Sequence, residues 1–269
     1  MLIAHPLTYT TSPSPSPSPP RSLSKDDWKT RFSLAGAKTI GHGSSGVVFA
    51  IDEQRVIKVF SLEEEGVLDL ERERAIYDKL QIDGKSSSYV VKFEEQWGSG
   101  LIMERLTGTL RQHLRKLGPF TTPFYARRWI REFCKGLAFL HENDILHGDI
   151  GCQNILLDTD DHIKLCDFAG SKLGDEEAWI SYEVRSQHPH FVGKQPTAQT
   201  EIFALGSVIY EIWTCRPPYA SEPDLVVQQK FLERDFPLSS LNDATIHEVV
   251  GKCWLGDYTS VAEVCMDIE

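Results

Sequence analysis

The sequence predicts an α+β fold in two lobes, a small β-rich lobe followed by a larger and mainly helical one. Up to about residue 104, short β-type runs alternate with turn residues, and one helical stretch interrupts them. Beyond Leu106, long stretches with a helical spacing of apolar residues prevail. The 269 residues, 41% of them hydrophobic, suffice for two lobes that share a cleft.

The β-rich lobe is expected over about residues 34–104. Its β-type runs cover residues 46–51, 55–60, 89–96 and 101–104, and its one helix covers residues 67–80. We place a hinge at about 104–107 and the helical lobe at about 108–269. In that lobe we expect helices over residues 124–142, 200–213 and 246–254, with two short β runs at 155–157 and 162–166.

The first 30 residues have a different composition. Ser and Pro alternate over residues 11–20, a pattern that cannot form a packed core and favours extended polyproline conformations. We expect a disordered tail over residues 1–30 and one folded domain over residues 31–269. An inert tail and a ligand for a proline-binding partner both fit this composition.

Charge and cysteine usage limit the classes of function. The formal charge of −11 would repel nucleic acid, so no nucleic-acid partner is expected; it suits basic peptide substrates, and simple solubility explains it equally well. The six cysteines have no zinc-type spacing. Neither a signal peptide nor a membrane span is predicted, so the default is an intracellular, cytoplasmic protein without membrane contact. The oligomeric state is not predicted.

A glycine-rich segment is the first chemical motif: Gly41-His42-Gly43-Ser44-Ser45-Gly46-Val47-Val48. It leads into a β run, which argues against a Rossmann fold, where a helix would follow. Glycines let backbone N–H groups approach phosphates closely, and Val48 would lie against an adenine. An ordinary hairpin would have the same sequence features.

Lys58 lies in the next β run, where strand alternation places it on one face with Val56. Such a lysine can bridge nucleotide phosphates if a carboxylate holds its side chain. Glu73 is the candidate, because on a helical wheel it shares a face with Ile76 and Tyr77, whereas Glu71 points to solvent. A solvated run of charges is the alternative interpretation of this helix.

Together these residues resemble the eukaryotic-type protein kinase family, and the family's remaining motifs follow in order. Residues 103–106, Met-Glu-Arg-Leu, resemble the adenine-binding hinge. Residues 147–154, His-Gly-Asp-Ile-Gly-Cys-Gln-Asn, resemble the catalytic loop, and residues 167–170, Asp-Phe-Ala-Gly, the metal-binding triplet. The 200–213 helix and the Pro217-Pro218-Tyr219 turn complete a resemblance that covers residues 34–264.

The resemblance implies ATP and Mg²⁺ as cofactors and a protein as substrate. Asp149 would accept a proton from the acceptor hydroxyl, Asn154 and Asp167 would bind magnesium, and Lys58, held by Glu73, would grip the phosphates. The nucleotide would contact Ile40, Gly41, His42, Gly43, Ser44, Ser45, Gly46, Val48, Val56, Lys58, Met103, Glu104, Leu106 and Leu156.

Several positions depart from the family pattern. Gly148 replaces the arginine that binds a phosphorylated activation segment, and residues 167–183 contain no threonine, so control by phosphorylation there is not expected. Gly151 replaces a cationic residue aimed at the γ-phosphate, which would slow transfer. Glu201 stands where an aspartate braces the catalytic loop, and Ala169 stands for a glycine. With these departures, the sequence also fits a small kinase of the fungal type.

We expect an ATP-dependent protein kinase acting on serine or threonine. A pseudokinase that serves as a nucleotide-binding scaffold is the first alternative. The second is a small-molecule phosphotransferase of the aminoglycoside or choline kinase type, which shares the His-Gly-Asp-Ile pattern with Asn five residues after the Asp.

Overall fold

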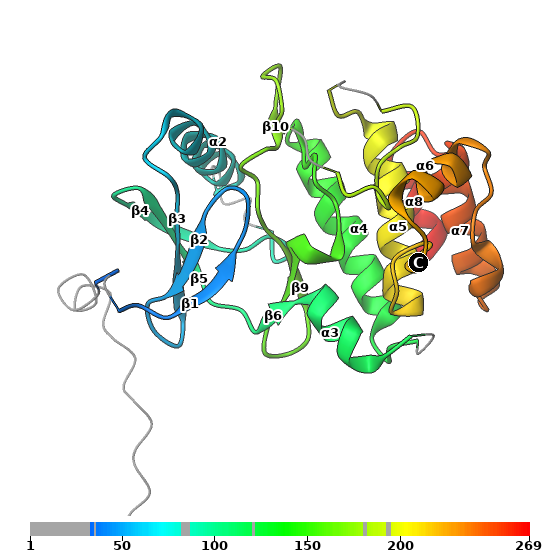
Figure 1. The fold of residues 1–269 in the computed structure, drawn as a ribbon, viewed down its shortest axis with the longest axis horizontal. Helices are drawn as coiled ribbons and strands as arrows, with labels where there is room; N and C mark the ends of the chain where they lie inside the picture. The colour runs from blue at the N-terminus through cyan, green and yellow to red at the C-terminus, as the bar shows by residue number, and fades with distance from the viewer. Residues whose placement is uncertain (1–32, 35, 82–86, 120–121, 180–181, 192–194) are drawn as a thin grey trace, which may run out of the picture.

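The computed structural model describes residues 33–34, 36–81, 87–119, 122–179, 182–191 and 195–269. The tail expected over residues 1–30 lies outside this range. A β-sheet-rich N-terminal region is followed by a helical C-terminal region (Figure 1), which confirms the predicted fold class. None of the helices in the described ranges is long and apolar enough to span a membrane.

One antiparallel sheet dominates the N-terminal region. Its strands stand in the order β1-β2-β3-β5-β4, with the bounds β1 (Thr39–His42), β2 (Val47–Ala50), β3 (Arg55–Val59), β4 (Phe93–Trp97) and β5 (Gly100–Glu104). Side chains of β3 alternate between the two faces of the sheet, as the sequence predicts. Ile57 packs with Ile102 on one face, and Val56 and Lys58 line a cleft on the other.

Helix α2 (Glu64–Gln81) packs beside this sheet. It starts with acidic residues and has Lys79 in its last turn, an arrangement that suits the helix dipole. Glu73, Ile76 and Tyr77 are buried and Glu71 is exposed. The helical wheel therefore assigned the inner and outer faces of α2 correctly.

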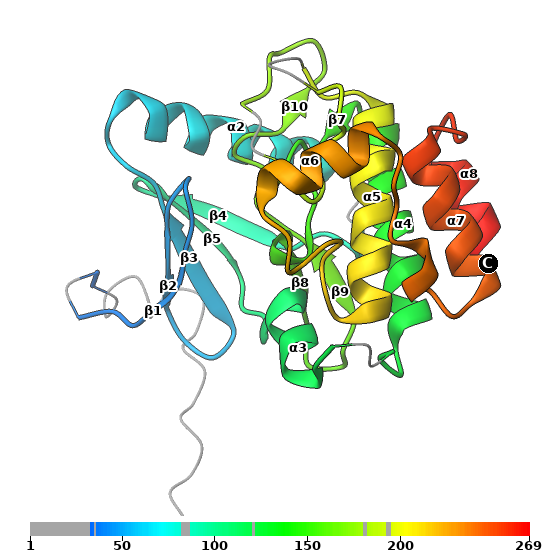
Figure 2. The same cartoon turned by 45° about the vertical axis from the view of Figure 1, so that its right-hand side comes forward.

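The C-terminal region is built around helices α4 (Ala126–Glu142) and α5 (Ala198–Thr214), which pack side by side (Figure 2). Residues 200–214 of α5 are all buried, because α7 (Ala244–Leu255) covers another side of it. Helix α8 (Val261–Ile268) packs on α4. Two further helices are shorter. Helix α3 (Leu110–Leu117) lies near the cleft, and helix α6 (Asp224–Leu232) lies near the outer surface.

Short strands pack against helices α3 and α4 of the C-terminal region. A three-stranded sheet has the order β6-β8-β9, and β10 pairs with β7; the bounds are β6 (Gly108–Thr109), β7 (Ile145–Leu146), β8 (Ile155–Leu157), β9 (Ile163–Leu165) and β10 (Lys172–Leu173). Two 3-10 turns, η2 (Cys152–Asn154) and η3 (Leu238–Ser240), complete the order of elements.

Some boundaries differ from the prediction for tertiary reasons. The β run expected over residues 89–96 begins only at Phe93, because Tyr89 and Val91 hydrogen-bond to Leu165 of β9 at 2.8 and 2.9 Å. Helix α4 begins after Pro123, whose carbonyl accepts the N–H of Ala126 at 3.0 Å. The sequence does not predict β1, α3, α6 or α8, which are short and depend on packing.

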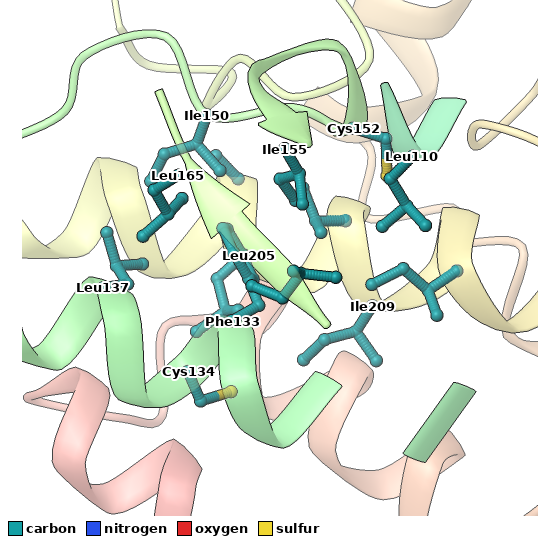
Figure 3. Packing of buried hydrophobic residues seen from close by; sticks show 14 of the residues in the cluster. Leu110, Phe133, Cys134, Leu137, Ile150, Cys152, Ile155, Leu165, Leu205 and Ile209 are labelled. Carbon is teal, nitrogen blue, oxygen red and sulfur yellow. The ribbon is translucent and has the colours of Figure 1, made fainter. Parts of the chain in front are cut away.

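The hydrophobic core reaches the loop formed by residues 147–154. Ile150 and Cys152 of this loop are at most 1% exposed and pack in the same cluster as Leu205 and Ile209 of α5 (Figure 3). Because these alternate residues are anchored in the core, the side chains of Asp149 and Gln153 are left on the cleft side. The core thus fixes the backbone from which the polar side chains project.

Candidate active site

A cleft of about 800 Å³ lies between the sheet and the helical region. It collects side chains from β1, β2, β3, α2, the 104–109 connection, α3 and the 147–154 loop. All residues for which the sequence predicts nucleotide contacts line this cleft: Ile40, Gly41, His42, Gly43, Ser44, Ser45, Gly46, Val48, Val56, Lys58, Met103, Glu104, Leu106 and Leu156. Glu73, Asp149, Asn154 and Asp167 line it too.

Lys58 joins two carboxylates from different parts of the chain. Its Nζ donates to Glu73 Oε2 at 2.5 Å and to Asp167 Oδ1 at 2.6 Å. Burial opposes the charge on Lys58, but Glu73 and Asp167 outweigh it and raise the pKa of the ammonium. Burial raises the pKa of Glu73 to about 7, against the attraction of Lys58. A lysine fixed in this way presents a cation to the cleft.

Asp167 keeps a charge that suits metal binding. Burial opposes its ionisation, but the neighbouring Lys58 ammonium prevails and lowers the pKa of Asp167 below its usual value. Its Oδ1 also accepts a hydrogen bond from Ser45 Oγ at 3.1 Å, which ties the glycine-rich turn to the floor of the cleft. Its Oδ2 accepts no hydrogen bond from the described residues.

Asn154 orients Asp149. The Nδ2 of Asn154 donates to the backbone carbonyl and to Oδ2 of Asp149, both at 2.8 Å. Both amide protons are thereby used, and the side-chain amide oxygen of Asn154, Oδ1, to which no described residue donates, is left free for a ligand. Burial raises the pKa of Asp149, in spite of His147 and Asn154, which favours a carboxylate that can take up a proton.

The loop around Asp149 is braced from α5. Glu201 is fully buried, accepts the N–H of Gly148 at 2.7 Å and bonds His141 Nε2 at 2.7 Å. A glutamate at this position therefore still holds the loop. Gly148 has φ +77°, a left-handed conformation that favours glycine.

Phe168 connects the segment after Asp167 to α2. Its ring is fully buried, 5.3 Å from the ring of Tyr77 in α2 and 5.3 Å from that of His147 in the loop. Ala169 beside it is also buried. This packing keeps Asp167 next to Lys58 and Glu73.

Arg72 of α2 holds the segment 171–179, a contact that the sequence does not predict. Its Nη1 donates to the carbonyl oxygens of Ser171 at 2.7 Å and of Glu177 at 3.0 Å. Its Nη2 lies 3.0 Å from a carboxylate oxygen of Glu176, and its guanidinium lies 5.0 Å from the centre of the Trp179 ring. One buried arginine thus fixes much of this segment.

Arg111 of α3 is a second unpredicted contact, at the mouth of the cleft. Its Nη1 donates to both carboxylate oxygens of Glu183, at 2.6 and 2.7 Å, and its Nε and Nη2 form a bidentate pair with Glu211 of α5, at 2.8 Å each. Burial opposes its charge, but the carboxylate of Glu211 prevails and raises the pKa of Arg111. Through these hydrogen bonds Arg111 fixes the position of Glu183, shortly after residues 180–181.

The glycine-rich turn offers open space to a ligand at Gly43, whose own N–H donates to the carbonyl of Gly46 at 3.0 Å, and the hinge offers a free backbone N–H. A Cβ at Gly46 would lie 2.5 Å from the carbonyl oxygen of Val59, so packing requires glycine there, whereas a Cβ at Gly43 would meet nothing within 4 Å. In the hinge, the N–H groups of Arg105 and Thr107 donate to carbonyls at 2.7 and 2.8 Å. The N–H of Leu106 between them has no acceptor among the described residues.

Comparison with known proteins assigns the family. The family model described as protein kinase domain matches residues 34–253. The chain therefore belongs to the protein kinase family, and protein kinases use ATP with magnesium and act on proteins.

Individual relatives support this assignment. The chain is 28% identical over 218 residues to mitogen-activated protein kinase kinase kinase dlk-1 of Caenorhabditis elegans, covering 76% of this chain and 22% of that protein. It is 28% identical over 245 residues to human 3-phosphoinositide-dependent protein kinase 1, covering 81% and 41%. It is 28% identical over 185 residues to serine/threonine-protein kinase PknB of Mycobacterium tuberculosis, covering 62% and 29%. The chain thus spans well under half of the length of each of these relatives.

Proposed function

We propose that this chain transfers the γ-phosphate of ATP to serine or threonine hydroxyls of proteins. The observation that carries the proposal is the convergence of Lys58, Asp167, Asp149 and Asn154 on one cleft, with the hydrogen bonds described above. A scaffold without nucleotide chemistry has no physical need for these four side chains together. The serine/threonine assignment is supported by the name of the PknB relative.

The cleft suits a nucleotide along its whole length. Val48, Val56 and Leu156 supply apolar walls for adenine, and the Leu106 N–H supplies a donor to its ring. The open backbone at Gly43 lets the phosphates approach. Lys58 then contacts the phosphates from the sheet side.

The residues present also fit magnesium. The side-chain Oδ1 of Asn154 and Oδ2 of Asp167 are hard oxygen ligands that are not used by other described residues, and the lowered pKa of Asp167 keeps its carboxylate ionised. Asn154 and Asp167 would hold the ion. Bound there, it would offset the negative charge on the phosphate oxygens.

Asp149 performs the proton transfer. It accepts the proton of the acceptor hydroxyl while that oxygen forms a bond to the γ-phosphorus, and the bond between the γ-phosphorus and the bridging oxygen of ADP breaks. The products are the phosphorylated side chain and ADP, and the proton leaves from Asp149. The Asn154 hydrogen bonds hold the carboxylate in line for this transfer.

We also infer that the kinase works without phosphorylation of the segment 171–183. Arg72 fixes its first half through backbone carbonyls, and Arg111 fixes Glu183. Both contacts are already made by unmodified residues. A phosphate is therefore not needed to order the described part of this segment.

The proposal is tested by binding and then by transfer. Thermal unfolding is measured with ATP alone and with ATP and magnesium, followed by transfer of labelled phosphate to a mixed basic protein substrate, to choline and to an aminoglycoside. We expect magnesium-dependent stabilisation, about 2.7 kcal/mol when ATP is at 100 times its Kd, and transfer to protein. Binding without transfer would indicate a pseudokinase, and transfer only to the small molecules would indicate the other alternative.

A further inference from the structure

Gly151 stands two residues after Asp149, where the family resemblance predicts a cationic side chain. Its backbone is extended, with φ −175° and ψ 161°, so backbone conformation does not require glycine there. The space beside it, however, is occupied by a side chain. A Cβ at this position would clash with the amide oxygen of Gln153 and lie 2.6 Å from the amide nitrogen. The Gln153 amide therefore fills the volume that a side chain at 151 would enter.

The Gln153 side chain lies beside the candidate base. Its Nε2 is 3.5 Å from Asp149 Oδ1, on the carboxylate oxygen that Asn154 does not use. A long hydrogen bond of this kind can tighten when the substrates bind. Gln153 also lines the cleft, and the buried neighbours Cys152 and Asn154 fix its backbone.

The amide is incompletely satisfied by the chain itself. Gln153 Oε1 is buried and has no hydrogen-bond partner among the described residues. Burying an oxygen without a hydrogen-bond partner costs free energy. Another rotamer of the side chain would expose the oxygen to water and avoid this cost. Because Oε1 only accepts hydrogen bonds, a donor on a bound molecule can satisfy it and a phosphoryl oxygen cannot, so any contact with a phosphoryl group has to use Nε2.

We propose that the Gln153 amide works at the phosphoryl-transfer centre in place of the missing cation, and that Gly151 serves to make room for it. The inference rests on the proposed kinase activity. One N–H of Nε2 donates to Asp149, and the second donates to an oxygen of the phosphoryl group in transfer. A neutral donor stabilises the developing charge less than an ammonium would.

This arrangement changes what a lysine at position 151 can achieve. In Gly151→Lys alone, the new side chain must displace Gln153, so one donor is exchanged for another. With Gln153→Ala added, the volume is free and the lysine can reach the phosphate. We therefore expect Gly151→Lys alone not to exceed the turnover of the wild type, and Gly151→Lys combined with Gln153→Ala to exceed the turnover of Gln153→Ala.

The kinetic test is a double-mutant cycle. Gln153→Ala should lower kcat roughly 10- to 100-fold with little change in the KM for ATP, because the lost contact forms only during transfer. Gly151→Ala should lower kcat in the same way, since the clashing atoms belong to a flexible side chain that can swing aside. Gly151→Ala added to Gln153→Ala should have no further effect. Gln229→Ala, an exposed glutamine of α6, is the matched control.

A binding measurement tests the inference independently of turnover. Tetrafluoroaluminate with ADP and magnesium mimics the phosphoryl group in transfer. Wild type should bind ADP more tightly in the presence of tetrafluoroaluminate, and Gln153→Ala should lose most of this gain while its affinity for magnesium-ADP alone stays within about twofold.

The outcomes separate the two proposals. A wild type that binds magnesium-ATP but transfers no phosphate overturns the proposed function, and the tetrafluoroaluminate measurement then still decides the role of Gln153. An active wild type whose Gln153→Ala variant keeps full kcat and full tetrafluoroaluminate affinity overturns the inference and shows that Gln153 only fills space. If the losses of kcat in Gly151→Ala and Gln153→Ala multiply in the double variant, the role assigned to Gly151 is overturned.

Discussion

Lys58 illustrates how one side chain serves both stability and the proposed chemistry. It is 6% exposed, and it neutralises Glu73, which is 1% exposed. Such an ion pair adds little net stability compared with apolar side chains, but losing one partner leaves a buried charge without compensation. The pair therefore constrains which substitutions the site tolerates.

We predict that Lys58→Met destabilises the fold by about 3 kcal/mol, because the carboxylates of Glu73 and Asp167 lose their shared cation. Adding Glu73→Gln should recover a large part of this loss without restoring phosphate transfer. Urea unfolding of the single and double variants measures the effect. A single variant as stable as the wild type would show that Glu73 is protonated and does not need Lys58.

At the level of elements, α2 and the segment 171–179 act as one unit. Arg72 supplies the connection from the buried side of the helix. Arg74, on the outer side, pairs among the described residues with the surface groups of Asp78 at 3.3 Å and Gln96 at 2.9 Å. The two arginines allow the connection to be tested with the same substitution on the same helix.

Arg72→Met should lower kcat at least tenfold and speed proteolytic cleavage within residues 171–179, because two carbonyls lose a charged donor. Arg74→Met should leave both properties near wild type. Kinetics and limited proteolysis of the unphosphorylated proteins provide the comparison. Equal behaviour of the two variants would contradict the role given to Arg72.

Helices α5 and α7 are closely packed at Gly206. A Cβ there would lie 2.8 Å from Cys253 Cβ and 3.2 Å from the Trp254 ring, whereas a Cβ at Gly251 would be in ordinary contact, 3.5 Å from Leu238. We predict that Gly206→Ala destabilises the fold by about 1–3 kcal/mol. Gly251→Ala should be neutral or stabilising by up to about 1 kcal/mol, because alanine favours helix. Thermal unfolding compares the two, and a stabilising Gly206→Ala would show that α7 shifts freely.

For the whole molecule, motif order was sufficient to predict which residues meet in the cleft. Lys58 and Asp167 are 109 positions apart, and a resemblance in residue type and order still placed them together. The contacts of Arg72 and Arg111 could not be predicted in this way. These contacts join residues that are 72 to 105 positions apart in the sequence. Their acceptors are backbone carbonyls or carboxylates, and no local sequence pattern distinguishes these groups from others of their kind. The position of the Gln153 side chain depends on the absence of a side chain at Gly151. The sequence of the 147–154 loop does not indicate this dependence.

Phosphate transfer by wild type and by Asp149→Asn tests the central claim most directly. Both proteins receive saturating ATP with magnesium and a mixed basic protein substrate, and the binding of ATP is measured in parallel. The account predicts measurable transfer by the wild type, a loss of about 10²- to 10⁴-fold in the variant, and similar ATP affinities. The exposed Asp175→Asn serves as control. Equal transfer by wild type and Asp149→Asn would contradict the assignment of Asp149 as the base of a kinase.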